Sequence, residues 1–479
     1  GNATSIARLE LNNTNGATLS SAITITDELT LTDGTFTTNG NLTLASSGSG
    51  DNVDDIGAVT RNGGTLSGNF TLDRKYGGIT TDTGVDAGEW RQISSPAQNI
   101  QYSALNTPFS TQGHDWADNP DGESILFSYD VSGGAYNAED GTNAVFESGR
   151  GYFFFVFEND FNGNPIVPTT WSITGSEHSN NITPSRVSDV SASDKFVLVG
   201  NPFAGYIDWN ALVTDGNTSG LKSIYQVYDP DQGGTIQYDQ STGNGAAGQY
   251  IAPGQGFWVE SNATSASFQF EKSMTEKDAS SVTLKSTTPP VPSIELSLNG
   301  TIGEKDLKSS VFLQFKPNSA SEADVTDATR LVPFGAAYVD IWSTTPDRQL
   351  VFDNRPGLAA NETETYAIDV TATGAGTYTL AWPQLKNIPD DWDLVLTDNV
   401  TNEARDLRAA DEYVFTIGDG DAALSTAKGT PHGPTTQSVQ DASSTRFTLE
   451  VSAAPLPVEL TRFDATASGA TAVLEWATA

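Results

Sequence analysis

The stretch WRQISSPAQNIQYSAL, residues 90–105, returns in altered form as FVLVGNPFAGYIDWNAL, residues 196–212, with Pro96 aligned to Pro202. Two further pairs follow in the same order: SILFSYD (124–130) with SIYQVYD (223–229), and SGRGYFFFV (148–156) with PGQGFWVE (253–260). This spacing predicts that one unit of roughly a hundred residues occurs twice. Such a duplication is typical of a structural module and not of a single catalytic centre.

Each copy contains a strand that ends in a proline turn and a Gly-x-Gly turn that leads into an aromatic strand. The aromatic residues, Tyr152 to Phe155 in the first copy and Phe257 with Trp258 in the second, are consecutive. Consecutive apolar side chains indicate a strand that is buried on both faces. We therefore expect them in the core of a β-sandwich or barrel, and the alternative is a platform for a ligand.

The N-terminal stretch ATLSSAITITDELTLTDGTFTTNGNLTLASS, residues 17–47, alternates apolar and polar residues between Asp-Gly and Asn-Gly turns. Short strands of this kind favour a small solenoid-like sheet. A solenoid requires a cap over its terminal coil, and we see no such cap in the sequence before this stretch. We expect the N-terminal edge of the sheet to be open.

The second half of the chain carries nine short alternating runs, from SIELSLNG to RFTLEVS, which predict a jelly-roll-like β-sandwich. The fold class expected for the whole chain is therefore all-β. The expected units are an N-terminal β region (1–72), a tandem duplicated module (73–272, with copies at about 73–170 and 171–272), a linker (273–292), the sandwich (293–453) and a C-terminal β-hairpin tail (454–479).

The formal charge of the chain is −36, and the chain contains no cysteine. A strongly acidic chain is repelled by nucleic acids and by anionic lipid surfaces, so we expect neither as a partner. The absence of cysteine excludes disulfides and Cys-ligated metals. The longest nearly apolar run, GYFFFVF, is far shorter than a membrane span, so we expect no membrane insertion.

The three histidines show no metal-ligand spacing, and no nucleophile or phosphate-binding motif occurs. We therefore expect no enzyme, with a secreted polysaccharide hydrolase as the third hypothesis for function, because glycosidases need only two carboxylates at a fixed separation.

Calcium is the one cofactor that the sequence suggests. The loop DFNGNP places Asp160, Asn162 and Asn164 at alternating positions, and Asp229 with Asp231 repeats the spacing in DPDQGG. Oxygen ligands at this spacing resemble half of a calcium loop. However, a proline stands where an EF-hand requires glycine, and the alternative interpretation is that these side chains make Asx turns between strands.

Several phrases resemble large cell-surface proteins that gram-negative bacteria export by type IX secretion. They are ISSPAQ with SGRGYFFF, VGNPFAGYIDWN with IAPGQGFWVE, GTYTLAW, LTDNVTNEARDL and, above all, LPVELTRFDATASGATAVLEWATA at 456–479. In such proteins the LPVEL phrase opens an immunoglobulin-like or fibronectin-like module, which here is cut after its second strand. The resemblance implies an extracellular location at the cell surface and a role as an adhesin, surface layer or fibre component.

The tail reads as a two-stranded hairpin, and a lone hairpin is marginally stable in water. We therefore expect another copy of the chain to complete it by strand donation, which gives a structural subunit of an extracellular homopolymeric filament or surface layer. The residues expected at this subunit interface are Val458, Leu460, Phe463, Leu474 and Trp476. Alternatively, the tail is a processed stub. The alternative function is a monomeric adhesin that binds surface glycans through exposed aromatics such as Trp116.

Overall fold

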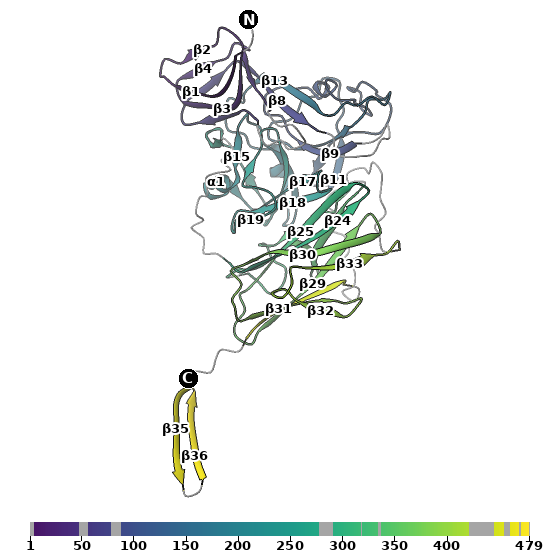
Figure 1. The fold of residues 1–479 in the computed structure, drawn as a ribbon. Coiled ribbons are helices and arrows are strands. Elements are labelled where there is room, and N and C mark those ends of the chain that lie inside the picture. The colour runs from purple at the N-terminus through teal and green to yellow at the C-terminus, as the bar shows by residue number, and fades with distance from the viewer. Residues whose placement is uncertain are drawn as a thin grey trace.

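A computed structural model describes residues 4–46, 56–77, 88–276, 291–317, 319–333, 337–420, 445–454, 460–468 and 471–478. The all-β fold class is confirmed, and helices are few and short in these ranges. Figure 1 shows an elongated molecule in which the N-terminal sheet lies at one end, the duplicated modules follow, and the sandwich and the C-terminal hairpin lie at the other end.

The N-terminal region is a parallel solenoid, as its alternating pattern predicts. Strands β1 (Thr4–Asn12), β3 (Ile23–Asp33), β5 (Leu42–Leu44), β6 (Ala58–Arg61) and β8 (Asn69–Tyr76) form one parallel sheet, and β2 (Ala17–Thr18), β4 (Thr35–Thr37) and β7 (Thr65–Ser67) form a second. Pairing in register stacks Ile25 on Leu44 and Leu44 on Leu72, and all three side chains are fully buried. Alternate residues therefore fill the interior, because side chains in a strand point to opposite faces.

The solenoid sheet is completed by a strand from much later in the chain. Strand β13 (Thr169–Ser176) pairs antiparallel with β8 over its whole length. The segment between these two strands contains the whole first module, so that module is held to the solenoid at both of its ends. The predicted boundary at residues 170 and 171 falls within β13.

The two copies of the repeat form sheets with the same strand order. The first copy consists of β9 (Gly88–Ile93), η1 (Tyr102–Leu105), β10 (Leu126–Asp130), β11 (Ala135–Ala138) and β12 (Tyr152–Phe157). The second consists of β14 (Phe196–Gly200), α1 (Trp209–Thr214), β17 (Leu221–Asp229), β18 (Gly234–Asp239), β19 (Asn244–Gly245) and β21 (Gly256–Ser261). The orders are β9-β12-β10-β11 and β14-β21-β17-β18-β19, and all neighbouring strands are antiparallel.

Smaller elements complete the second copy. They are η2 (Ser185–Asp189), β15 (Tyr206–Asp208), β16 (Thr218–Ser219), β20 (Tyr250–Ile251), β22 (Ser267–Phe268), η3 (Lys272–Met274) and β23 (Thr275–Glu276). Asp208 caps α1, because its carboxylate accepts hydrogen bonds from the backbone N–H groups of Asn210 (2.8 Å) and Ala211 (3.3 Å). Much of the predicted linker, residues 277–290, lies outside the described residues.

The Gly-x-Gly turn of each copy lies against the proline-turn strand of the other copy. The N–H of Gly151 donates to Leu198 O (3.1 Å), and in the opposite direction the N–H of Ser94 donates to Gly254 O (2.7 Å). A Cβ atom on Gly151 would lie 2.4 Å from Val199 O, and one on Gly256 would lie 2.9 Å from Ile93 O. Glycine is therefore required because the two backbones approach so closely.

The consecutive aromatic residues are buried, as predicted. Every residue of β12 is buried, and Phe257 and Trp258 of β21 are 0% and 3% exposed. Trp258 packs edge-to-face on Tyr129 of the first copy, with ring centroids 4.9 Å apart. The solenoid and both copies thus share one hydrophobic core.

The sandwich contains all nine predicted strands. They are β24 (Ser293–Ile302), β25 (Lys305–Phe315), β27 (Val339–Thr344), β28 (Gln349–Arg355), β29 (Thr363–Ala372), β30 (Gly376–Lys386), β31 (Trp392–Asp398), β33 (Glu412–Ile417) and β34 (Phe447–Ala453), joined by the short β26 (Ala328–Thr329) and β32 (Glu403–Asp406). Hydrogen bonds link these strands in one sheet, in the order β32-β31-β34-β29-β27-β28-β25-β24-β30-β33 with β26 beside β28. This sheet has its own core, which is separate from that of the modules.

The second module and the sandwich meet through a small apolar cluster and several ion pairs. Ile224 of the module packs with Phe312, Ala328, Val351 and Phe352 of the sandwich. Around this cluster, charged side chains of the two units pair: Arg348 with Asp194 (2.7 Å), Lys316 with Asp239 (2.8 Å) and, from the first module, Glu89 with Lys305 (2.7 Å). These contacts fix the sandwich against the modules.

The predicted C-terminal hairpin is present. Strand β35 (Leu460–Ser468) pairs antiparallel with β36 (Thr471–Thr478), and Phe463 lies opposite Trp476 in the register. Within the described part of the chain, these two strands pair only with each other. Figure 1 shows the hairpin apart from the sandwich.

Candidate functional site

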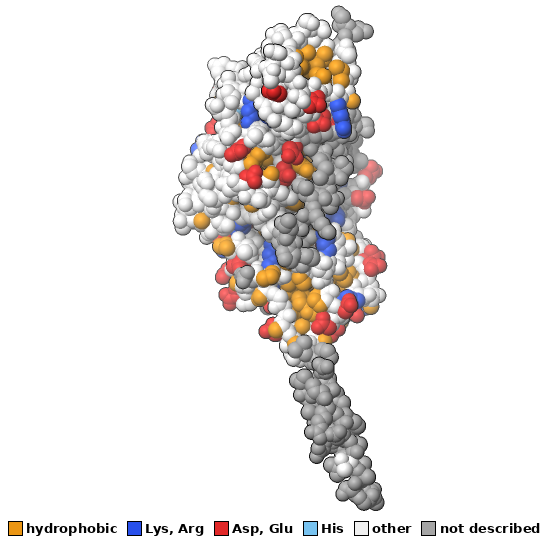
Figure 2. Space-filling model, turned by 90° about the vertical axis from the view of Figure 1, so that its left-hand side faces the viewer, with side chains coloured by type: hydrophobic (Ala, Val, Ile, Leu, Met, Phe, Trp, Pro, Cys, Tyr) orange, Lys and Arg blue, Asp and Glu red, His pale blue; other side chains and the backbone are white. Residues whose placement is uncertain are grey.

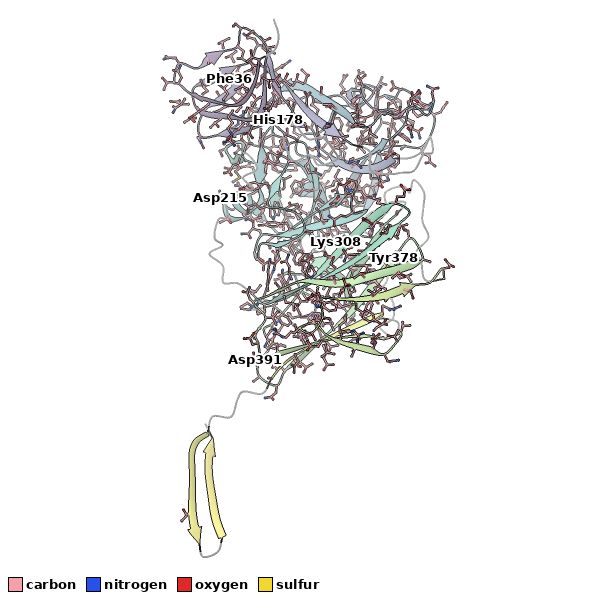
Figure 3. The ribbon with its side chains drawn as sticks, viewed as in Figure 1. Phe36, His178, Asp215, Lys308, Tyr378 and Asp391 are labelled. Atoms are coloured by element: carbon pink, nitrogen blue, oxygen red, sulfur yellow. The ribbon has the colours of Figure 1, made fainter. Side chains whose placement is uncertain are left out.

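The two histidines that the structure describes, His114 and His178, are buried. His114 Nε2 accepts hydrogen bonds from the backbone N–H groups of Ile125 (2.9 Å) and Leu126 (3.0 Å), and its ring stacks on Trp116. His178 is 4% exposed, and its Nδ1 lies 3.2 Å from Ser148 Oγ. Burial lowers the pKa of both histidines, that of His178 to about 4. Figure 3 shows His178 close to the solenoid, where it adjoins the second module.

The first calcium candidate forms a closed turn on the surface. Asp160 Oδ1 accepts hydrogen bonds from the backbone N–H groups of Asn162 (2.9 Å) and Asn164 (2.8 Å), and Asp160 Oδ2 accepts from Asn164 Nδ2 (2.8 Å). The hydrogen bonds from Asn164 lower the pKa of Asp160. This geometry is that of the Asx turn named as the alternative. Calcium binding here stays a prediction.

The second calcium candidate has a similar turn in the hairpin between β17 and β18. Asp229 Oδ1 accepts from the N–H of Asp231 (2.9 Å), and Asp229 Oδ2 accepts from Gln232 Nε2 (2.6 Å). Among the residues that the structure describes, no group of three or more His, Cys, Asp or Glu side chains could hold a metal ion.

The first strand of the solenoid is an edge strand. In the described ranges β1 pairs with β3 alone, and most of its residues are exposed. In β1, Ile6 and Leu9 are only partly buried and Leu11 is buried, whereas Ile25 and Leu29, the partners of Ile6 and Leu9 on β3, are fully buried. The interior of the solenoid is therefore incompletely covered at this end. Figure 2 shows hydrophobic side chains gathered near the N-terminal end of the molecule.

The predicted interface residues fall in the tail. Leu460 and Phe463 are in β35, and Leu474 and Trp476 are in β36. Val458 lies outside the described residues.

Trp116, the aromatic residue suggested for glycan binding, is not available at the surface. Its side chain is 4% exposed, and its Nε1–H donates to Glu139 O (2.7 Å). Every other tryptophan whose side chain the structure describes is also buried. A binding platform of exposed tryptophans is therefore wrong for this part of the chain.

A cavity of about 390 Å³ lies where the last solenoid strand, the first module and the second module meet. Arg74, Lys75 and Tyr76 come from β8, Arg91 and Gln92 from β9, and the remaining wall from the second copy. The aromatic residues of the wall are Tyr76, Tyr206, Tyr225, Tyr228 and Tyr250. Asp229 and Asp231 also line the cavity, whereas Asp160 does not.

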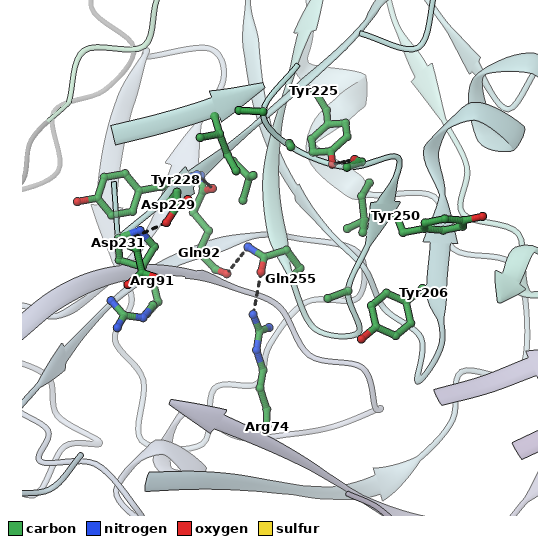
Figure 4. A pocket seen from close by; sticks show the side chains of 18 of the residues that line it. Arg74, Arg91, Gln92, Tyr206, Tyr225, Tyr228, Asp229, Asp231, Tyr250 and Gln255 are labelled. Atoms are coloured by element: carbon green, nitrogen blue, oxygen red, sulfur yellow. Dashed lines mark hydrogen bonds between the residues drawn. The ribbon is translucent and has the colours of Figure 1, made fainter. Parts of the chain in front are cut away.

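A chain of hydrogen bonds crosses the wall of the cavity. Arg74 Nη2 donates to Gln255 Oε1 (2.8 Å), Gln255 Nε2 donates to the backbone oxygen of Gln92 (3.0 Å), and Gln92 Oε1 accepts from the N–H of Tyr228 (2.7 Å). Figure 4 shows Gln255 between Arg74 and Gln92. These bonds join the solenoid, the first copy and the second copy at one place.

No motif in the sequence marks Arg74, Gln92 or Gln255, although Gln92 and Gln255 lie within the repeats. The aligned prolines place Arg91 and Gln92 opposite Val197 and Leu198 of the second copy. These two strand positions are polar in the first copy and apolar in the second. That difference is the signal in the sequence that could have indicated the cavity.

One family of proteins matches the chain: that described as Domain of unknown function (DUF8693), over residues 5–423. No curated protein and no solved structure matches. No described helix is long and apolar enough to cross a membrane.

Proposed function

Because the chain belongs to the DUF8693 family, whose description assigns no activity, we propose a function from geometry: a structural subunit of an extracellular homopolymeric filament or surface layer. Copies assemble head to tail when the C-terminal hairpin of one adds to the solenoid edge of the next. The resemblance to type IX secreted surface proteins supports the extracellular, cell-surface location.

The observation that carries the proposal is the pair of sheet edges at opposite ends of the molecule. Strand β1 has nine residues, as has β35, and β36 has eight. An edge strand presents a row of N–H and C=O groups that can pair with another strand. Strand addition at β1 would also cover Ile6 and Leu9, whose burial is incomplete.

The positions of the two edges determine the kind of assembly. The donating hairpin and the accepting strand are different surfaces, so the contact is heterologous and repeats without closing. Each copy has a formal charge of −36, which opposes association at low ionic strength. We therefore expect longer polymers at about 0.5 M salt, where the Debye length is only a few ångströms, than at about 0.01 M.

The test uses two defective variants of the full chain. A tail-less chain that ends at residue 454 keeps the accepting edge, and the double substitution Ile6→Lys and Leu9→Lys keeps the donating tail. Each alone should be monomeric by light scattering, and their mixture should give a dimer that does not grow. Val414→Lys, at an exposed position on the sandwich strand β33, is the control and should still polymerise.

Monomers of the unmodified chain at high concentration and high salt, seen as isolated particles by negative-stain microscopy, would overturn the proposal. So would a mixture of the two variants that contains no dimer. In either case the tail would be better explained as a processed stub or as the start of a further module.

A monomeric cell-surface adhesin is the second candidate. The cavity between the solenoid and the two module copies favours it, because concave walls of aromatic residues with a few polar groups are typical of ligand sites.

A further inference from the structure

We propose that the cavity between the solenoid and the two module copies binds an acidic saccharide, through a sugar carboxylate that pairs with Arg74. This inference does not depend on polymer formation. It rests on a buried charge, on unpartnered polar atoms and on the shape and composition of the wall.

The buried charge is the guanidinium of Arg74, which is 3% exposed. Its Nη1 donates to the backbone oxygens of Gly254 and Pro253 and its Nη2 to Gln255, so its protein partners are all uncharged. The other buried arginines in the described ranges each pair with a carboxylate: Arg61 with Glu177, Arg150 with Glu147, Arg330 with Asp340 and Arg355 with Asp353. A buried cation without a counter-charge is costly, and an anionic ligand would remove that cost.

Three buried polar atoms of the same wall have no hydrogen-bond partner: Arg74 Nε, Gln92 Nε2 and Tyr76 Oη. All three side chains are at most 3% exposed. The first two atoms can only donate, and the tyrosine hydroxyl can do so as well. Three unused donors in residues of one wall are suited to acceptor oxygens, which a carboxylate supplies with up to four lone-pair positions.

The remaining wall suits a sugar ring. Tyr206, Tyr228 and Tyr250 line the cavity together with Val227 and Ile236, so apolar C–H groups of a ring would meet aromatic and aliphatic side chains. The carboxylates of Asp229 and Asp231 at the same cavity can accept hydrogen bonds from sugar hydroxyls. A volume of about 390 Å³ is within the usual range for small-ligand sites and corresponds to one or two sugar units.

Titration calorimetry on the full chain tests the proposal, with glucuronate and galacturonate as probes and glucose, galactose and acetate as comparisons. We expect a uronate to bind and the comparison compounds to bind at least tenfold more weakly. Tyr76→Phe removes one donor to a charged group and should weaken uronate binding about tenfold. Gln92→Glu keeps the acceptor for Tyr228 but replaces the donor with a negative charge, and should abolish binding.

Tyr366→Phe is the matched control, because Tyr366 Oη is also buried without a partner but lies in the core of the sandwich. It should leave uronate binding unchanged. If neutral sugars bound as tightly as the uronates, the role of Arg74 would be overturned. If acetate bound as tightly as the uronates, the saccharide part of the proposal would be overturned and the site would be a simple anion site. Absence of binding by both uronates, with protein whose thermal unfolding is normal, would overturn the proposal as a whole.

Discussion

Acidification should destabilise the protein through His178. This side chain is 4% exposed and packs edge-to-face near Phe203, and its Nε2 has no partner. Burial and the positive charge of Lys272 lower its pKa from 6.5 to about 4. The unfolded chain therefore takes up a proton below pH 6.5 that the folded chain does not. Stability that is present at pH 7 is lost as the pH falls from about 6.5 to about 4.

The size of the effect follows from the two pKa values. The fall of the pKa from 6.5 to about 4 corresponds to roughly 3 kcal/mol over the whole window. At pH 5 the unfolded histidine is almost fully protonated and the folded one is mostly neutral. The loss at that pH is then about 2 kcal/mol.

The assay compares the chain with its His178→Gln variant by urea unfolding at several pH values. Carboxylates and His114 are present in both proteins, so their contributions cancel in the difference. We expect the variant to gain about 2 kcal/mol relative to the unmodified chain between pH 7.5 and pH 5. Two stability curves that remain parallel over this range would refute the reasoning. Lys272→Met should raise the pKa of His178, which NMR of labelled histidine would measure directly.

Two further predictions concern a close backbone contact between the two copies and a buried ion pair within the second copy. Gly151→Ala places a Cβ atom 2.4 Å from Val199 O and should lower the melting temperature by several degrees, because backbone must shift to relieve the clash, whereas Gly357→Ala, with nothing within 4 Å, should not. Lys222→Met removes the cation that pairs with Glu260 (2.9 Å) and Asp194 (3.3 Å) in a buried position, and should cost about 3 kcal/mol or more in urea unfolding. Arg405→Met breaks the exposed pair with Glu403 and should cost less than about 1 kcal/mol. An equal cost for both ion pairs, or for both glycines, would contradict these arguments.

The sequence was informative where a local period determines the structure. Alternation at Ile23 and Ile25 predicted the solenoid strands, and the aligned prolines predicted two copies that indeed share a strand order. What it could not show were contacts between distant segments. No residue near Thr169 indicates that β13 pairs with β8. That pairing depends on how the whole first module folds between the two strands.

The cavity could not be predicted for the same reason. Arg74, Gln92 and Gln255 come from three different units, and each looks ordinary in its own strand or turn. Exposure is also a property of the folded chain, which is why Trp116 was wrongly suggested as a surface residue.

The crossed contacts between the two module copies bear on how the protein arose. The turn containing Gly151 is seated on the second copy, and the turn containing Gly254 is seated on the first, so each half supplies what the other lacks. Two identical copies with this arrangement would form a symmetric pair of separate chains. The tandem module therefore has the form of an ancestral homodimer joined into one polypeptide. After such a fusion the two halves are free to diverge, and Gln92, which lines the cavity, stands at the position that Leu198 occupies in the other half.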